Sequence, residues 1–191
     1  IAVDSTGNIY LTGWTDGGIN GNSANRQSWI AKYDNSGNLQ WHKPLESRAY
    51  DLSNGQITIG KDGHLYLAGR TYGTLDNTTT GNTDAWFAKY DSDGNQKWAQ
   101  KLGNSAFDEA TGIAVDNDGV VYITGQTQGN LGGTNQGDAD AWLAKYDNNG
   151  SQVWVKQLGT VAEDKAYGVA VDNKGHIYIS GQTFAQLGDT Y

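Results

Sequence analysis

The stretch that decides the fold is Ala88-Lys-Tyr-Asp-Ser-Asp-Gly-Asn-Gln-Lys-Trp98. The same pattern of Ala-Lys-Tyr-Asp, Gly and Trp returns at 31–41 and again at 144–154. Each copy predicts a strand, a tight turn and a second strand, because Asp can cap a turn and Gly readily takes a positive φ. The three copies belong to a longer unit that repeats along the whole chain.

The repeat has a step of 56 residues. Its first motif begins at Ile1, Ile57, Ile113 and Val169, and reads Ile-Ala-Val-Asp in two of the four copies. A step of this length is typical of propellers and solenoids. Two single-residue insertions, one before Trp86 and one near Gln56, shift the spacing. We expect both in loops, where insertions are tolerated.

One unit contains four predicted strands, which in the third copy are residues 112–116, 120–127, 140–147 and 151–159. No segment has a convincing helical periodicity. Four antiparallel strands in a unit of this size form one blade of a β-propeller. We therefore predict an all-β chain with about three and a half blades: blade 1 at 1–56, blade 2 at 57–112, blade 3 at 113–168 and a half blade 4 at 169–191. A half blade does not close a ring, so we expect further blades in a longer chain, or other copies of the chain, to complete it.

Two parts of this unit resemble a known family. The run Gly112-Ile-Ala-Val-Asp-x-x-Gly-x-x-Tyr-x-Thr-Gly125, followed by Asp140-Ala-Trp-x-Ala-Lys-Tyr-Asp147, resembles the SBBP-type bacterial β-propeller repeat. The resemblance covers essentially the whole chain. It implies a propeller in a bacterial, often large, secreted or surface-associated protein, and it transfers no catalytic residue.

Two weaker resemblances concern single elements. The first two strands of each unit resemble NHL-type blades. Ala31-x-x-Asp-x-Ser-Gly-x-x-x-Trp41 is similar to the tryptophan-docking motif of quinoprotein propellers, except that its Asp is one position later. In that motif the Trp braces neighbouring blades, and it does not by itself imply a quinone cofactor.

Composition excludes several classes of function. The chain has 13 Lys and Arg against 21 Asp and Glu, a net charge of -8, which argues against nucleic-acid binding. No apolar run approaches the length that crosses a bilayer, so we expect no membrane insertion. The absence of Cys excludes disulfides, thiol catalysis and Cys-based zinc sites. Three scattered His form neither a metal spacing nor a catalytic triad, so we predict no enzyme and no cofactor apart from the calcium considered below.

The two ends of the blades differ in their connections. The first and third connections of each unit are tight turns, whereas the second and fourth are longer and lie at the opposite end. We expect a ligand at this long-loop face, which is built from residues 16–27, 73–83, 128–139, 47–54, 104–111 and 160–167. The candidate ligand-binding residues are those that break the repeat there: Trp14, Arg26 and Arg70.

Aspartates recur at the same end. Asp84 and Asp140 begin the third strand of their units, and Asp108 and Asp164 precede the first strand. One interpretation is structural, with carboxylates that accept backbone N–H bonds and fix the loops. The other is a calcium site made of carboxylates and loop carbonyls.

Three functions remain open. The first is a non-catalytic extracellular or cell-surface scaffold or adhesion module that binds protein or glycan. The second is a structural subunit that assembles head to tail into a filament or sheath. The third is a fragment of a propeller enzyme with its site in the central channel.

Overall fold

The computed structural model describes residues 1–16, 26–45, 51–71 and 83–186, with the backbone alone at 26 and 51–55. Every regular element in these residues is a β-strand. Three sheets have four antiparallel strands and one has two. This confirms the prediction of propeller blades. None of the described residues forms a helix that could cross a membrane.

In each sheet the strands are hydrogen-bonded in chain order. Blades 1 and 2 comprise β1 (Ala2–Val3), β2 (Ile9–Asp16), β3 (Arg26–Tyr33), β4 (Leu39–Pro44), β5 (Asp51–Ile59), β6 (Leu65–Thr71), β7 (Asp84–Tyr90) and β8 (Gln96–Leu102). Blade 3 and half blade 4 comprise β9 (Asp108–Val115), β10 (Val121–Thr127), β11 (Asp140–Tyr146), β12 (Gln152–Leu158), β13 (Asp164–Val171) and β14 (Ile177–Thr183).

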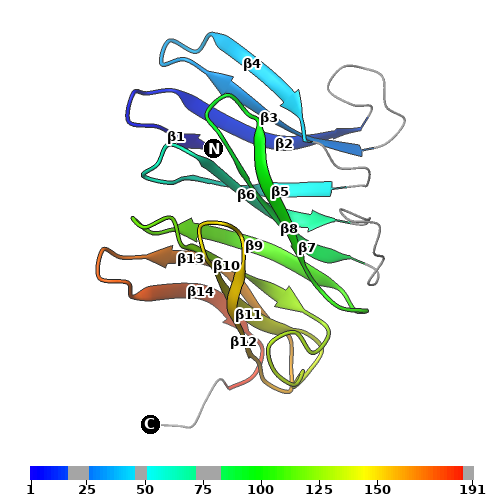
Figure 1. The fold of residues 1–191 in the computed structure, drawn as a ribbon. Helices are drawn as coiled ribbons and strands as arrows, with labels where there is room; N and C mark the ends of the chain where they lie inside the picture. The colour runs from blue at the N-terminus through cyan, green and yellow to red at the C-terminus, as the bar shows by residue number, and fades with distance from the viewer. Residues whose placement is uncertain (17–25, 46–50, 72–82, 187–191) are drawn as a thin grey trace.

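In Figure 1 blade 1 lies at the top, blade 2 lies below it, and blade 3 and half blade 4 overlap in the lower part of the view. The tight hairpin turns point toward the left of the view, and the longer connections lie toward the right. The two ends of the blades are therefore separate surfaces, the hairpin-turn face and the long-loop face.

Each hairpin turn is closed by its own residues. In the turn between β11 and β12, Asp147 Oδ1 accepts hydrogen bonds from the backbone N–H groups of Asn149 and Ser151, at 2.9 and 2.8 Å. Gly150 has a φ of 83° there, and glycines with positive φ occupy all seven hairpin turns. A side chain at such a φ is strained. The Asp and Gly of the repeat are thus used by the turn, as the sequence predicted.

The first strands of blades 2 and 3 and of half blade 4 begin earlier than the sequence predicted. We expected the residues from 104 to 111 to be a loop, but β9 starts at Asp108. A β-bulge at Thr111 leaves this residue without a partner in the ladder, because Gly112 pairs with Thr124 and Ala110 with Gly125. A bulge bends a strand without ending it, which explains the error.

The same correction applies to β5 and β13, which begin at Asp51 and Asp164. In β5 the bulge holds two residues, 54 and 55, because Ser53 and Gln56 pair with consecutive residues of β6. The insertion that we expected in a loop near Gln56 therefore lies inside a strand. The insertion expected before Trp86 lies among residues outside the described ones.

In blades 2 and 3, the Trp of the third strand packs toward the preceding blade. Trp86 belongs to a buried cluster with Tyr10 and Ile30 of blade 1, and Trp142 belongs to one with Tyr66 and Phe87 of blade 2. Both indoles are 1% exposed. These rings, with the aliphatic side chains around them, form the interior between successive blades.

In blades 1 and 2, the Trp of the fourth strand packs toward the following blade. A Cβ at Gly94 would be 2.8 Å from the Trp41 ring, and one at Gly150 would be 3.0 Å from the Trp98 ring. Trp98 Nε1 also donates a 3.2 Å hydrogen bond to the carbonyl of Asn148. The expectation that this Trp braces neighbouring blades is confirmed, and the glycine of the facing turn leaves room for the indole.

We predict that Trp98→Ala destabilises the protein by about 2–4 kcal/mol, because it removes the ring between blade 2 and the hairpin turn of blade 3. Trp154 occupies the same repeat position, but blade 4 has no such hairpin among the described residues. Trp154→Ala is therefore the matched control, with an expected loss of about 1 kcal/mol or less. Urea denaturation of both variants measures the difference, and equal losses would contradict the bracing role.

Candidate functional site

At the long-loop face, successive blades are joined by backbone hydrogen bonds. Thr83 and Phe107 form a parallel bridge between blades 2 and 3, and the Asp108 N–H donates to the Thr83 carbonyl at 2.8 Å. Ala139 and Glu163 form the equivalent bridge between blade 3 and half blade 4. We call each bridge with its flanking aspartates a seam. The seams place the four predicted aspartates in pairs, Asp84 with Asp108 and Asp140 with Asp164.

The seam between blades 2 and 3 holds two buried carboxylates. Asp84 is 4% exposed and forms a 3.1 Å ion pair with Lys101. Asp108 is fully buried and accepts a 2.8 Å hydrogen bond from the backbone N–H of Asn104. A Cβ at Gly103 would overlap Asp84, so the glycine is needed to seat this carboxylate.

The second seam repeats this arrangement with other donors. Asp140 accepts a 2.9 Å hydrogen bond from Gln157 Nε2 and a 3.1 Å bond from the backbone N–H of Gln136. Asp164 accepts from both the backbone N–H and the hydroxyl of Thr160. These hydrogen bonds agree with the structural interpretation of the aspartates, in which the carboxylates fix the loops.

The Asp108 carboxyl resists ionisation. Burial raises its pKa, hydrogen bonds from Thr127 and from the Asn104 backbone oppose this, and the nearby Asp84 carboxylate raises it further. The net shift is upward. The other oxygen of Asp108, Oδ1, is buried without a hydrogen-bond partner in the described structure, and so is Oδ1 of Asp164.

The calcium interpretation needs more donors than these carboxylates. Calcium takes six to eight oxygen ligands. The described residues contain no group of three or more His, Asp or Glu side chains placed to hold a metal. Each seam offers its two carboxylates, so calcium there would take backbone carbonyls and water as its remaining ligands. It stays a prediction.

Beside the seams, the residues that break the repeat form a row across the blades, which we call the polar row. Arg70 of β6 is 3.4 Å from Glu109 of β9, and Gln126 of β10 donates a 2.9 Å hydrogen bond to the same Glu109. The Arg70 guanidinium also lies 5.8 Å from the Phe107 ring centroid. The row therefore crosses from blade 2 to blade 3. It consists of Arg70, Glu109 and Gln126 and, by repeat position, of Trp14, Lys165 and Gln182.

The three predicted ligand-binding residues have different outcomes. Trp14 is 46% exposed on β2, at the repeat position that Arg70, Gln126 and Gln182 occupy in later blades. Arg70 is half-buried in the polar row. Arg26 pairs with Asp16 through the backbone, and its side chain lies outside the described residues. The structure thus places two of the three on one repeat position.

Sequence reasoning missed Glu109, which joins Arg70 to Gln126. A signal was present, because Leu52, Glu109 and Lys165 occupy one repeat position and differ as much as Trp14 and Arg70 do. Ion pairing between blades depends on which strands become neighbours, and spacing alone does not give this.

The histidine contacts in the described part of the chain do not point to a catalytic pair. The His–carboxylate contacts there are local to hairpin turns, such as His176 Nδ1 to Asp172 Oδ2 at 2.8 Å. The His176 hydrogen bonds lower the Asp172 pKa to about 2. These contacts keep the Asp172 carboxylate ionised and stabilise the hairpin turn.

A sequence profile described as "SBBP: Beta-propeller repeat" matches residues 1–20, 97–132 and 153–188. These three segments resemble SBBP propeller repeats. The second and third matched segments run from the last strand of one blade through the first two strands of the next, and so they span the blade junctions. The chain is thus a repeat scaffold of the β-propeller type.

Two relatives share this repeat region. The regulatory protein FlaEY of Caulobacter vibrioides is 31% identical over 146 residues, which cover 67% of this chain and 15% of the relative. An uncharacterized WD repeat-containing protein of Acanthamoeba polyphaga mimivirus is 28% identical over 131 residues, 62% of this chain and 9% of that protein. The chain thus spans less than a sixth of either relative.

We predict that Asp108→Asn is at least as stable as the wild type at pH 7. The raised pKa means that the folded state binds the Asp108 proton more tightly than the unfolded state. This contribution favours folding at low pH and is lost as the pH rises above the ordinary aspartate value of 3.8. Asn keeps an acceptor for the Asn104 N–H and removes the charge.

Thermal melts between pH 3 and pH 7 check this, with Asp108→Ala as the matched variant. Alanine loses the acceptor and should cost about 1–3 kcal/mol at both ends of the range. If Asp108→Asn is as unstable as Asp108→Ala at pH 7, the carboxylate charge is required and a cation at the seam becomes the better explanation.

Proposed function

We propose that this chain is a non-catalytic propeller module of an extracellular or cell-surface bacterial protein, and that it binds protein or glycan at its long-loop face. The observation that carries the proposal is that the repeated residues stabilise the fold, whereas the variable residues lie together at the long-loop face. Those that recur between blades serve turns, seams and the packing between blades, whereas the polar row varies: one of its positions holds Trp14, Arg70, Gln126 and Gln182, and the other holds Leu52, Glu109 and Lys165. Variation at one position on a constant scaffold is how a repeat protein makes a specific surface.

The polar row has chemistry suited to such a ligand. The exposed Trp14 indole can stack on a sugar ring or on a partner's side chain. Arg70, Glu109 and Gln126 offer donors and acceptors held in fixed positions by their contacts with one another. The net charge of -8 favours a neutral or cationic ligand over an anionic one.

The extracellular location rests on the SBBP resemblance. Accessibility of the protein to protease or antibody on intact cells that produce it tests this part of the proposal. A protein found only inside the cells would contradict it and would leave the binding proposal to be tested on its own.

We predict that Trp14→Ala and Arg70→Ala each weaken ligand binding by about tenfold or more, as expected for contacts near the centre of an interface. A glycan array and a screen of purified surface proteins supply the ligand. Leu39→Ala is the matched control, because Leu39 is 50% exposed on the hairpin-turn face. Binding that is lost equally in all three variants, or that none of them changes, would place the ligand elsewhere.

Calcium at the seams is a separate proposal, supported by the buried second oxygens of Asp108 and Asp164. If calcium binds there, millimolar CaCl2 raises the melting temperature relative to EDTA; Asp108→Asn reduces that rise, and Asp108→Asn combined with Asp164→Asn abolishes it. Magnesium chloride at the same concentration is the control for ionic strength. Melting temperatures that agree in calcium and in EDTA would remove the calcium proposal.

A further inference from the structure

Among the described residues, the edge of half blade 4 is open. β14 pairs with β13 on one side, whereas its counterparts β6 and β10 also pair with the third strand of their own blades. Tyr178 of β14 is 58% exposed, whereas Tyr10, Tyr66 and Tyr122 at the same repeat position are 1%, 0% and 3% exposed. An edge strand with exposed apolar side chains is ready to pair with another strand.

Blade 3 has an open face beside this edge. In blade 2 every residue of β7 is buried, whereas in β11 buried and half-buried residues alternate. β7 is covered on its forward side by blade 3, for example through Phe87, whose ring centroid is 4.5 Å from that of Tyr146. The equivalent of Phe87 is Leu143, which the described residues leave half-buried.

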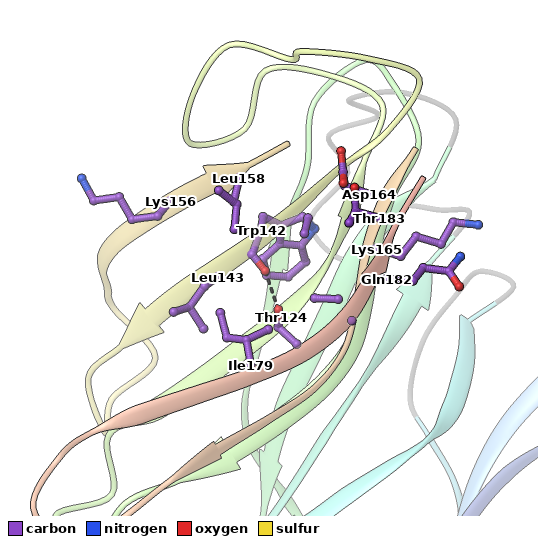
Figure 2. A pocket seen from close by; sticks show the side chains of 13 residues that line it. Thr124, Trp142, Leu143, Lys156, Leu158, Asp164, Lys165, Ile179, Gln182 and Thr183 are labelled. Atoms are coloured by element: carbon purple, nitrogen blue, oxygen red, sulfur yellow. Dashed lines mark hydrogen bonds between the residues drawn. The ribbon is translucent and has the colours of Figure 1, made fainter. Parts of the chain in front are cut away.

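An apolar cleft lies between this face and β14 (Figure 2). It has a volume of about 390 Å³. Leu143 and Leu158 of blade 3 form one wall, and Ile179 and Gly181 of β14 line the other side. In the drawing these side chains converge on one space, with Lys156 and Lys165 at its margins.

The repeat shows what fills the equivalent space one blade earlier. Ala85 and Phe87 of blade 2 are in one buried cluster with Trp142 of blade 3, and Leu102 packs against that cluster. Moved by one repeat, these three are Ala141, Leu143 and Leu158, and all three line the cleft. The side chain that corresponds to Trp142 is then an indole on a third strand of blade 4.

A glycine in β14 leaves room for the same Trp. Gly13 and Gly125 pair with Trp29 and Trp142 across the ladder. A Cβ at Gly125 would overlap the Glu109 carbonyl of the neighbouring strand and would also be 2.8 Å from the Trp142 ring, and a Cβ at Gly181 would likewise overlap the Lys165 carbonyl. Gly181 holds this repeat position in β14 and lines the cleft. A strand paired with β14 in the usual register would thus place a Trp opposite Gly181.

We propose that the β14 edge and the cleft bind a β-hairpin with this chain's own pattern Trp-x-Ala-Lys-Tyr-Asp-x-x-Gly-x-x-x-Trp. The interaction is β-strand addition, in which main-chain bonds give affinity and alternate side chains give specificity. It is separate from ligand binding at the long-loop face.

Two further contacts select this pattern over other hairpins. The Lys of each third strand covers the Tyr opposite it: Lys89 Nζ lies 5.1 Å from the Tyr66 ring centroid, and Lys145 Nζ lies 5.6 Å from that of Tyr122. Tyr178 would receive the incoming Lys in the same way. The Gly of the incoming turn would face Trp154, as Gly150 faces Trp98.

The test uses the whole chain with a synthetic peptide of residues 136–159 as the probe. Hydrogen exchange of amides 177–183 should slow when the peptide is added, because β14 gains a ladder partner. In the control peptide, Trp142→Ala and Lys145→Glu remove the indole and reverse the charge. We expect it to protect these amides at least about tenfold less at equal concentration.

Two exposed aliphatic residues of the chain give matched variants. Leu158 is 56% exposed on the cleft wall, so Leu158→Ser should leave the fold intact and weaken peptide binding by roughly fivefold or more. Val161 is 84% exposed and does not line the cleft, so Val161→Ser should leave binding unchanged. Equal effects of the two variants would overturn the proposal.

A fusion of the peptide to the chain tests the proposal if the free peptide does not fold. Residues 136–159 appended after Tyr191 keep the step of 56 residues. The fusion should raise the melting temperature and protect amides 177–183. If it does neither, the proposal is wrong. If the unmodified chain protects these amides by itself as its concentration rises, two copies pair edge to edge, and that outcome would also overturn it.

Discussion

Each blade of this chain is a thin sheet that cannot bury both of its apolar faces by itself, and the rest of the structure depends on that constraint. Neighbouring blades supply the missing cover. Trp86 is buried against the blade before it, and Trp98 packs on the blade after it. β7 is buried on both faces because it lies between two blades, whereas β14 at the end of the row is largely exposed.

Glycine has a second use at these contacts, besides the positive φ of the turns. At Gly125 the absence of Cβ lets an indole lie against the strand, and at Gly103 it admits the Asp84 carboxylate. An alanine at either position would push apart groups that are otherwise in contact. The high glycine content of the chain is therefore partly a packing requirement.

Much of the fold could be predicted from the sequence because the same motifs occur in several copies of the repeat. The Asp-x-x-Gly turns are local, so each copy can be recognised without knowing the neighbours. The bulge at Thr111 was missed, because a strand with one unpaired residue looks like a strand that starts later. The sequence predicted the aspartates of the seams, because they recur at fixed repeat positions. It did not predict their partners Lys101 and Gln157, because these residues differ between blades. The polar row depends on contacts across strands that are distant in the sequence, as in Arg70 with Glu109.

The closed hairpin turns have a consequence for how such a protein changes over generations. Asp147 and Gly150 close their turn without a residue from another blade. Each repeat unit therefore contains the residues that form its own hairpin turns. Every junction also uses the same pair of surfaces. Unequal recombination between the repeated stretches of the gene can therefore add or delete a blade and leave each junction intact. What such an event alters is the order of side chains along the polar row, so one crossover can produce a new surface on an unchanged framework.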